Sequence, residues 1–165
     1  MRTTLRLFLA GTACVLVSAL PTTEAALSTE DLSVRVVCSE ALRAPRTERR
    51  AVFGVVMERA RLGGWWGDSV RNVLLAKHQF ASPWNPWCSK ELPDRDDGVV
   101  WSRPMVELHA RLLREIRQDV QRMMTGDLQA PLSGATYFHA RRLGDLWPHL
   151  QEFDVPSSWR HRFYR

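Results

Sequence analysis

One carboxylate lies in a stretch of otherwise apolar or small residues, at Glu40 in V-V-C-S-E-A-L (residues 36–42). Leu32, Val36 and Glu40 are four residues apart, so a helix would place them on one face. Partial loss of water on an inward face would raise the pKa of Glu40. A carboxylic acid with a raised pKa can protonate a leaving oxygen near neutral pH, as a glycosidase requires. The alternative is a Glu40 that points outward and is solvated, like most surface glutamates.

Two cysteines are candidates for a disulfide. Cys38 lies two residues before Glu40, Cys88 follows a segment rich in proline and tryptophan, and Cys14 lies near the N-terminus. An oxidising compartment would allow Cys38 and Cys88 to pair, and two free buried thiols are the alternative. Because the chain has neither a C-x-x-C nor an H-x-x-x-H spacing, a metal site has little support and we expect no cofactor.

The helix that carries Glu40 is marked at both ends. Ser28 or Thr29 can cap its start, and acidic residues in the first turn suit the positive end of the helix dipole. It should end near Arg43, because Ala44-Pro45 follows.

The middle of the chain predicts two more helices and a long loop. Thr47 can cap a second helix, which Gly63-Gly64 would end, and Asp68 can cap a short third helix. Residues 78–101 are rich in proline and turn formers, so they predict a long loop region, which in a compact domain is usually functional or disordered.

The longest predicted helix runs from a cap at Ser102 to Gly126. Its apolar residues recur at steps of three and four, which is a strong helical period: Met105, Leu108, Leu112, Ile116, Val120 and Met123. After a turn, A-T-Y-F-H-A (135–140) predicts a short strand, and W-R-H-R-F-Y-R (159–165) predicts a second strand or an extended tail. The expected fold is a mainly helical α+β domain with a small antiparallel β element near its C-terminus.

The whole chain suits one exported domain. It has 165 residues and a formal net charge of +5, nearly all from arginines spread along its length. Such a spread fits a generally anionic surface better than a nucleic-acid stripe, so we expect no nucleic-acid partner. Heavy arginine use in a GC-rich genome is the alternative explanation. Residues 1–25 have the order of a signal peptide: Arg2 and Arg6, an uncharged run at 7–20, and small residues at 23 and 25. Cleavage would leave residues 26–165 in the periplasm or cell wall with no stable membrane span, and a releasable signal-anchor is the alternative.

Four motifs carry a resemblance to a known family, and they occur in its order. They are S-E-A-L-R-A-P (39–45) before a helix with M-E-R-A-R (57–61), then Gln79-Phe80, then G-A-T-Y-F-H-A (134–140), and last S-S-W-R-H-R-F-Y-R (157–165). They resemble G-E-A-R-G-E-P with V-x-N-R, Q-F-S, G-A-T-x-F-H and I-G-x-H-x-F-Y-R of the cell-wall hydrolases typified by spore cortex-lytic enzymes. The resemblance covers about residue 32 to the end.

The resemblance implies a lysozyme-like fold and a peptidoglycan lytic transglycosylase. Such an enzyme cuts the β-1,4 bond between N-acetylmuramic acid and N-acetylglucosamine and leaves a 1,6-anhydro sugar. The family's catalytic glutamate carries over to Glu40. Because the substrate's own 6-hydroxyl can act as nucleophile, no second acid is required. The obvious alternatives for a second acid, Asp94, Asp96 and Asp97, lie in a turn-rich segment that we expect to be a solvated loop.

The other motif residues suit sugar binding, because aromatic faces pack on pyranose rings and amides or imidazoles hold hydroxyl groups. The candidates are Gln79, Phe80, Tyr137, His139 and Tyr164. The alternative for Phe80, Phe138 and Phe163 is a place in the core, and His139 could brace the strand pair. The expected partner is the peptidoglycan glycan strand, bound by a monomer.

The chain departs from the family pattern at three places. Ser39 replaces a glycine, Leu42 and Ala44 alter the segment after the glutamate, and Ser158-Trp159 replaces the isoleucine and glycine of the last motif. The first two changes adjoin Glu40 and bear on substrate preference. Two other functions stay open: a non-catalytic wall-binding or assembly protein, and a phage-type lysis enzyme held in the membrane by residues 7–20.

Overall fold

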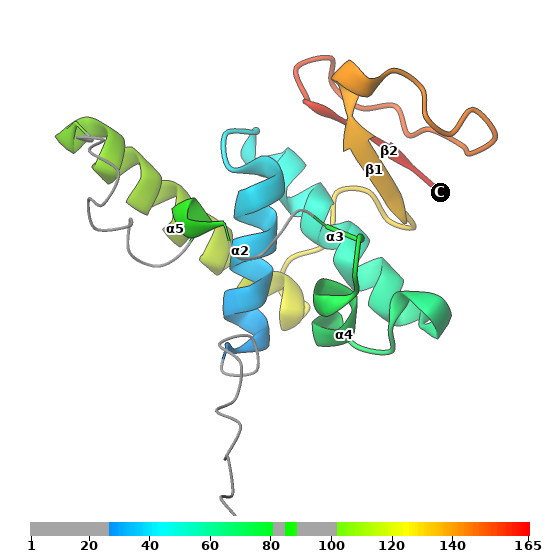
Figure 1. Ribbon diagram of the computed structural model, residues 1–165, viewed down its shortest axis with the longest axis horizontal. Helices are drawn as coiled ribbons and strands as arrows, with labels where there is room; N and C mark the ends of the chain where they lie inside the picture. The colour runs from blue at the N-terminus through cyan, green and yellow to red at the C-terminus, as the bar shows by residue number, and fades with distance from the viewer. Residues whose placement is uncertain (1–26, 81–84, 89–101) are drawn as a thin grey trace, which may run out of the picture.

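A computed structural model of the protein describes residues 27–80, 85–88 and 102–165. Helix α2 (Thr29–Ala41) runs through the middle of the molecule (Figure 1). Three helices contact it: α3 (Arg46–Leu62), α4 (Val70–Leu75) and α5 (Arg103–Met124). Short 3-10 turns form at η1 (Gly64–Trp66), η2 (Pro86–Cys88) and η3 (Arg141–Leu143). Among the helices described, none is long and apolar enough to cross a membrane.

The C-terminal part of the chain forms a two-stranded antiparallel sheet. Strand β1 (Tyr137–Ala140) pairs with β2 (His161–Tyr164), so that Tyr137 lies opposite Tyr164 and Ala140 lies opposite His161. The sheet lies at one side of the helices, where β1 contacts α3 (Figure 1). The prediction of a mainly helical α+β domain with a small C-terminal β element is confirmed.

The helix starts follow the predictions with small shifts. Ser28 caps α2 by accepting a hydrogen bond from the backbone N–H of Asp31. Helix α3 begins earlier than predicted, because Pro45 leads directly into Arg46, and no side chain caps it, so the prediction of a cap at Thr47 is wrong.

The cap of α4 lies one residue after the predicted cap, Asp68. Ser69 caps it by accepting from the N–H of Asn72, and Asp68 instead accepts from the side-chain amide of Asn72. The helix that carries Glu40 and the end of α3 at Gly63 agree with the prediction.

The core lies between α2, α3 and the second half of α5. Leu32 and Val36 of α2 are fully buried, as are Val52, Val55 and Val56 of α3. Phe163 of β2 closes the core on the side of the sheet. The face of α2 that the spacing of Leu32 and Val36 predicts is therefore the face that packs.

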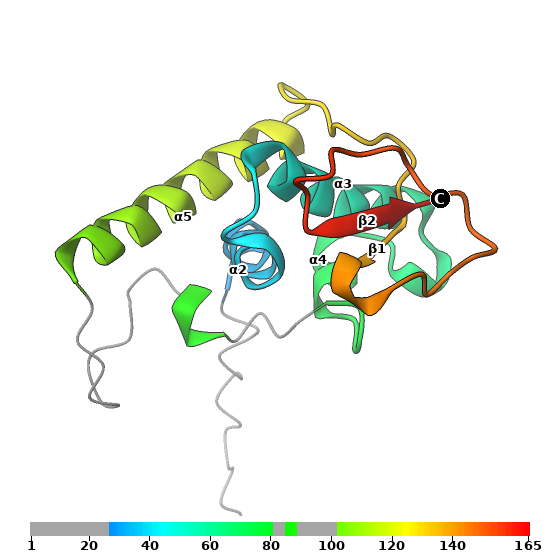
Figure 2. The ribbon, with the colours of Figure 1, turned by 90° about the horizontal axis from the view of Figure 1, so that it is seen from above.

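Helix α5 buries only half of its predicted apolar stripe. Ile116, Val120 and Met123 lie in the core, whereas Met105 and Leu108 are exposed. Figure 2 shows why: the C-terminal half of α5 lies against α3, and its N-terminal half extends past α2. Among the described residues, the first half of this stripe therefore faces no core.

Ion pairs join the start of α3 to α5. Asp119 accepts hydrogen bonds from the guanidinium groups of both Arg46 and Arg50, at 2.8 to 3.1 Å. Arg49 donates to Glu115 at 2.7 Å and to the carbonyl of Ala44. The carboxylates of Glu115 and Asp119 therefore hold the N-terminal turns of α3 against α5.

Candidate active site

Glu40 lies near the C-terminal end of α2, half-buried, at the wall of a hollow of about 420 Å³. The other side of this hollow, called here the Glu40 hollow, comes from the segment after α4 and from the two strands, with Gln79, Phe80, His139 and His161 in its lining. Of the described residues that line it, Glu40 is the only carboxylate. The fold therefore brings residue 40, residues 79–80 and the sheet together, although they lie far apart in the sequence.

A buried glutamate that the sequence analysis missed holds His161. Glu48 of α3 is 0% exposed and accepts hydrogen bonds from the backbone N–H groups of Arg160 and His161, at 2.8 and 2.9 Å. Its Oε1 also lies 2.7 Å from Nδ1 of His161. Because Oε1 already accepts from two backbone N–H groups, it acts as an acceptor toward Nδ1 as well, so Nδ1 donates and Nε2 is the nitrogen left for other partners. Glu48 thereby fixes both the start of β2 and the orientation of an imidazole in the Glu40 hollow.

His139 is held from both ring nitrogens. Nδ1 lies 3.0 Å from the carbonyl of Ala140, which can only accept, so Nδ1–H donates to it. Nε2 lies 2.9 Å from the hydroxyl of Tyr164, and the two rings stack. Burial raises the pKa of Tyr164, so its hydroxyl stays protonated at neutral pH and can donate to Nε2. Both nitrogens of His139 therefore have protein partners, and the residue braces the wall of the hollow.

Two of the predicted sugar-binding residues lie away from the hollow. Tyr164 is only 1% exposed and lies behind His139, outside the lining of the Glu40 hollow, so its contact with substrate stays a prediction that its burial does not support. Tyr137 is half-buried and packs against Trp66 and Trp147 outside the lining of the Glu40 hollow. Gln79 and Phe80 do line it, as predicted for substrate-binding residues, although their contact with substrate stays a prediction.

A buried arginine lies behind this lining. Arg59 of α3 is 5% exposed, and its guanidinium lies 4.3 Å from the ring of Trp66 and 5.1 Å from that of Phe80. Its Nε donates to the carbonyl of Thr136 at 2.8 Å, and its Nη1 donates to Oε1 of Gln79 at 3.4 Å. No ion pair joins it to a carboxylate in the part of the chain that the structure describes. Aromatic faces and carbonyl oxygens therefore take the place of an acid.

The positive charge of Arg59 interacts electrostatically with Glu40. Burial lowers its pKa to about 10, and the attraction of Tyr137 and then of Glu40 opposes this shift. A pKa near 10 still leaves the group protonated at neutral pH. The sequence signal for Arg59 was its place in M-E-R-A-R, which resembles the V-x-N-R of the family helix.

A disulfide between Cys38 and Cys88 joins the helix of Glu40 to η2, with a Cα–Cα distance of 5.6 Å. Beside it lies a second hollow of about 260 Å³, called here the bridging hollow, whose lining includes Glu40, Leu42, Arg43 and Trp87. Trp87 was not among the predicted site residues. The candidate second acids at 94, 96 and 97 lie outside the described residues.

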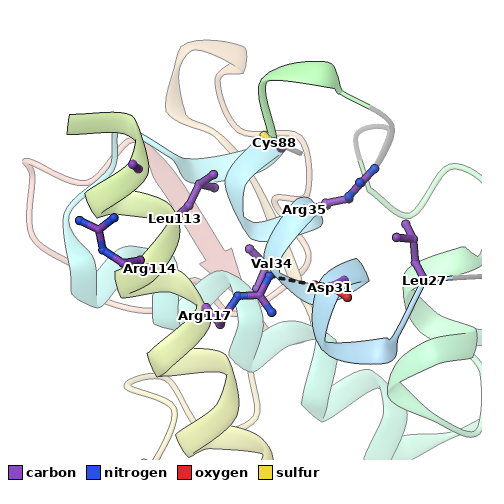
Figure 3. Close-up of a pocket in the computed structure, with 9 residues that line it drawn as sticks. Leu27, Asp31, Val34, Arg35, Cys88, Leu113, Arg114 and Arg117 are labelled. Carbon is purple, nitrogen blue, oxygen red and sulfur yellow. Dashed lines mark hydrogen bonds and ion pairs between the residues drawn. The ribbon is translucent and has the colours of Figure 1, made fainter. Parts of the chain in front are cut away.

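A separate pocket lies on the other side of α2, since Asp31 in its lining is about two and a half helical turns from Glu40. Arg117 donates to Asp31 at 2.8 Å (Figure 3). It also donates to Glu30. The side chains of Arg35 and Arg114 point away from each other in Figure 3. These guanidinium groups do not converge on one point, so the pocket has no centre for an anion.

The sequence profile of a family described as Cell Wall Hydrolase matches residues 43–164. The match includes Gln79, His139 and His161, and it begins just after Glu40. No curated protein and no solved structure matches the chain. The role of Glu40 therefore rests on its motif and on its place in the hollow.

Proposed function

The chain belongs to the Cell Wall Hydrolase family, and from this premise we propose that it is an exported peptidoglycan glycosidase whose catalytic acid is Glu40. The family match over residues 43–164 confirms the resemblance to cell-wall hydrolases and makes the chain a hydrolase of the cell wall. One observation carries the finer proposal: among the described residues of the Glu40 hollow, Glu40 is the only carboxylate. The lysozyme-like arrangement that the resemblance implies stays a prediction.

The proposed reaction cleaves the β-1,4 bond between N-acetylmuramic acid and N-acetylglucosamine as a lytic transglycosylase. Glu40 first gives its proton to the glycosidic oxygen as the bond to the anomeric carbon breaks. The resulting carboxylate then takes the proton of the 6-hydroxyl of the same muramic residue, whose oxygen bonds to the anomeric carbon. The products are a 1,6-anhydro sugar and a free 4-hydroxyl. No water is consumed, so one carboxylate is enough, in contrast to a two-carboxylate glycosidase.

The walls of the hollow have chemistry that suits this substrate. The side chain of Gln79 is fixed, because its Nε2 donates to the carbonyl of Trp66 at 3.3 Å while its Oε1 accepts from Arg59. Phe80 offers a ring face for a pyranose. His161, fixed by Glu48, offers a ring nitrogen to a hydroxyl or acetamide. We propose these three residues as the sugar-binding groups beside Glu40.

Replacement of Glu40 by glutamine tests the proposal. Glu40→Gln keeps the shape of the side chain and removes the proton donor, so wall cleavage should fall about 1,000-fold, as expected for loss of a general acid. Release of anhydromuropeptides from isolated walls, followed by mass spectrometry, measures both the rate and the product. The matched control is Glu107→Gln, on the exposed side of α5, which should cleave at the wild-type rate. A Glu40→Gln protein that clears walls as fast as wild type would exclude this mechanism, and reducing ends in place of anhydro ends would replace transglycosylation by hydrolysis.

Two further measurements separate the other functions. A protein that co-sediments with walls and releases no product would be a binding or assembly protein. N-terminal sequencing of the mature protein distinguishes cleavage near residue 25 from a retained anchor, because an intact Met1 excludes processing by signal peptidase.

A further inference from the structure

A third hollow adjoins the bridging hollow, and it is almost entirely apolar. It has a volume of about 580 Å³ and lies between the end of α2, η2 and the first half of α5. Its lining includes Leu42, Trp87, Met105, Leu108 and Leu112, and we call it the α5 groove. Its volume is in the range of small-ligand sites.

The α5 groove and the Glu40 hollow both adjoin the bridging hollow. The bridging hollow shares Glu40 with the Glu40 hollow, and it shares Leu42, Arg43 and Trp87 with the α5 groove. The three hollows therefore follow one another from Gln79 past Glu40 to the start of α5. A polymer seated at Glu40 would extend into this groove.

The groove has built walls. The Cys38–Cys88 disulfide ties η2 to α2 next to Trp87, and Nε2–H of His109 donates to the carbonyl of Trp87. The facing wall is the half of the α5 stripe that meets no core, where Leu108 is 39% exposed. No described core residue packs on this half of the stripe, and an exposed apolar face of this kind marks a contact surface.

The chemistry of the groove differs from that of the Glu40 hollow. Its described lining carries Arg43 and His109 and no carboxylate. Arg43 is exposed, and among the described residues no ion pair joins it to an acid. The surface therefore suits a ligand with methyl groups and a negative charge.

The peptide stem of muramic acid has that chemistry, since it branches from the sugar through a lactyl group and carries alanine methyl groups and free carboxylates. We infer that the α5 groove binds the peptide stem of the muramic acid next to the cut, with its methyl groups on Leu108 and Met105 and a carboxylate at Arg43. This inference rests on the proposed function and adds a preference to it: the enzyme favours strands that carry peptide stems over bare glycan.

The test compares two substrates and two variants of the full chain. Isolated peptidoglycan and the same material stripped of its stems by an amidase are cleaved over a range of concentrations. Wild type should reach half-maximal rate at an approximately tenfold lower concentration of the peptide-bearing wall, a ratio that corresponds to a few apolar contacts. Leu108→Glu removes an apolar contact and repels the stem, so the two substrates should become equal for this variant, while cleavage of stripped glycan stays at the wild-type rate.

Val106→Glu is the matched control, since Val106 is 38% exposed on the same helix and lies outside the groove lining. It should keep the wild-type preference. Met105→Glu, on the same wall as Leu108, should lose it and serves as a second variant if Leu108→Glu fails to fold in a thermal melt.

Three other results would overturn either this inference or the proposed function. Wild type that cleaves both substrates with equal half-saturation overturns the inference and leaves the proposed function intact. Absence of product from both substrates overturns the proposed function itself. A wild-type dimer that Leu108→Glu converts to a monomer in analytical ultracentrifugation overturns the inference, because a second copy of the chain would then cover the groove.

Discussion

The two ends of α3 hold their arginines in different ways. At the first end, Arg49 and Arg50 donate to Glu115 and Asp119 of α5, with Arg46 beside them. At the other end, Arg59 lies among aromatic rings and donates to the carbonyl of Thr136. Arginine side chains thus form ion pairs with carboxylates at the first end, and cation–π contacts and hydrogen bonds to carbonyl groups at the other end.

The difference separates a structural role from a role at the site. A guanidinium that is matched by a carboxylate is neutralised locally, and the pair links two helices. A guanidinium that is matched by aromatic faces keeps its net charge, and in a poorly hydrated place its field extends further. The charge of Arg59 reaches Glu40, so we expect the first end of α3 to govern stability and the second to govern activity.

Arg59→Met should have the largest effect, and on activity. The substitution keeps an apolar stem near Trp66 and Phe80 but removes the charge near Glu40 and the donor to Gln79. We expect wall cleavage to fall about 100-fold, as when a preorganised donor is lost from an active site. The free energy of unfolding should fall by only about 1 kcal/mol, because the carbonyl of Thr136 loses its partner. Product release and thermal melting measure the two quantities.

Arg61→Met is the control for this variant. Arg61 lies two residues further along α3, with its side chain 68% exposed, and it pairs with Glu58. It should change neither the rate nor the melting temperature. Equal losses of rate in the two variants would show that Arg59 has no particular role at the site.

Asp119→Ala should have the next largest effect, and on stability. Asp119 is buried and accepts from Arg46 and Arg50, both of which can swing toward water once it is removed. We therefore expect a loss of about 2 kcal/mol in the free energy of unfolding, as for hydrogen bonds to charged groups. Denaturant titration measures this loss, and cleavage per folded molecule should stay at the wild-type value. A loss of activity without a loss of stability would reverse the roles assigned to the two ends of α3.

Lowering the pH should reduce the free energy of unfolding through Asp119, by less than the Asp119→Ala substitution does. Burial raises the pKa of Asp119, but hydrogen bonds from Arg46 and Arg50 lower it more, so its pKa lies below the ordinary value of 3.8. The folded chain therefore binds the proton less readily than the unfolded chain does. The contribution of Asp119 is complete above 3.8 and is lost as the pH falls through the lower folded value. Denaturant titrations at decreasing pH should show a steeper loss in wild type than in Asp119→Asn, and parallel curves would contradict this account.

Local patterns predicted much of the fold and the position of Glu40. Four-residue spacing placed Glu40 on the same helix as Leu32 and Val36, and helical period predicted α5. The same period could not tell that Met105 and Leu108 would be exposed, because it reports which face is apolar and not what covers that face.

The parts of the site that the sequence did not predict depend on distant partners. Glu48 accepts hydrogen bonds from residues 160 and 161, and Arg59 meets rings from three separate segments. Tyr164 shares a motif with His161, yet its buried ring packs against His139 and Trp147, while His161 lines the hollow. Such contacts follow from the packing of the sheet on α3, which no local pattern encodes.

The Cys38–Cys88 disulfide closes a covalent ring over a separation of 50 residues that contains α3 and α4. By restricting the unfolded chain, a ring of that size contributes about 4 kcal/mol to stability in the chain-entropy account. It also changes what a protease can do. A single cut between residues 39 and 87 opens the ring but leaves both pieces joined through sulfur, with Glu40 still attached to η2 and Trp87. If a protease in the surroundings of the cell wall cut the chain once within this ring, Glu40 would therefore stay covalently linked to Trp87.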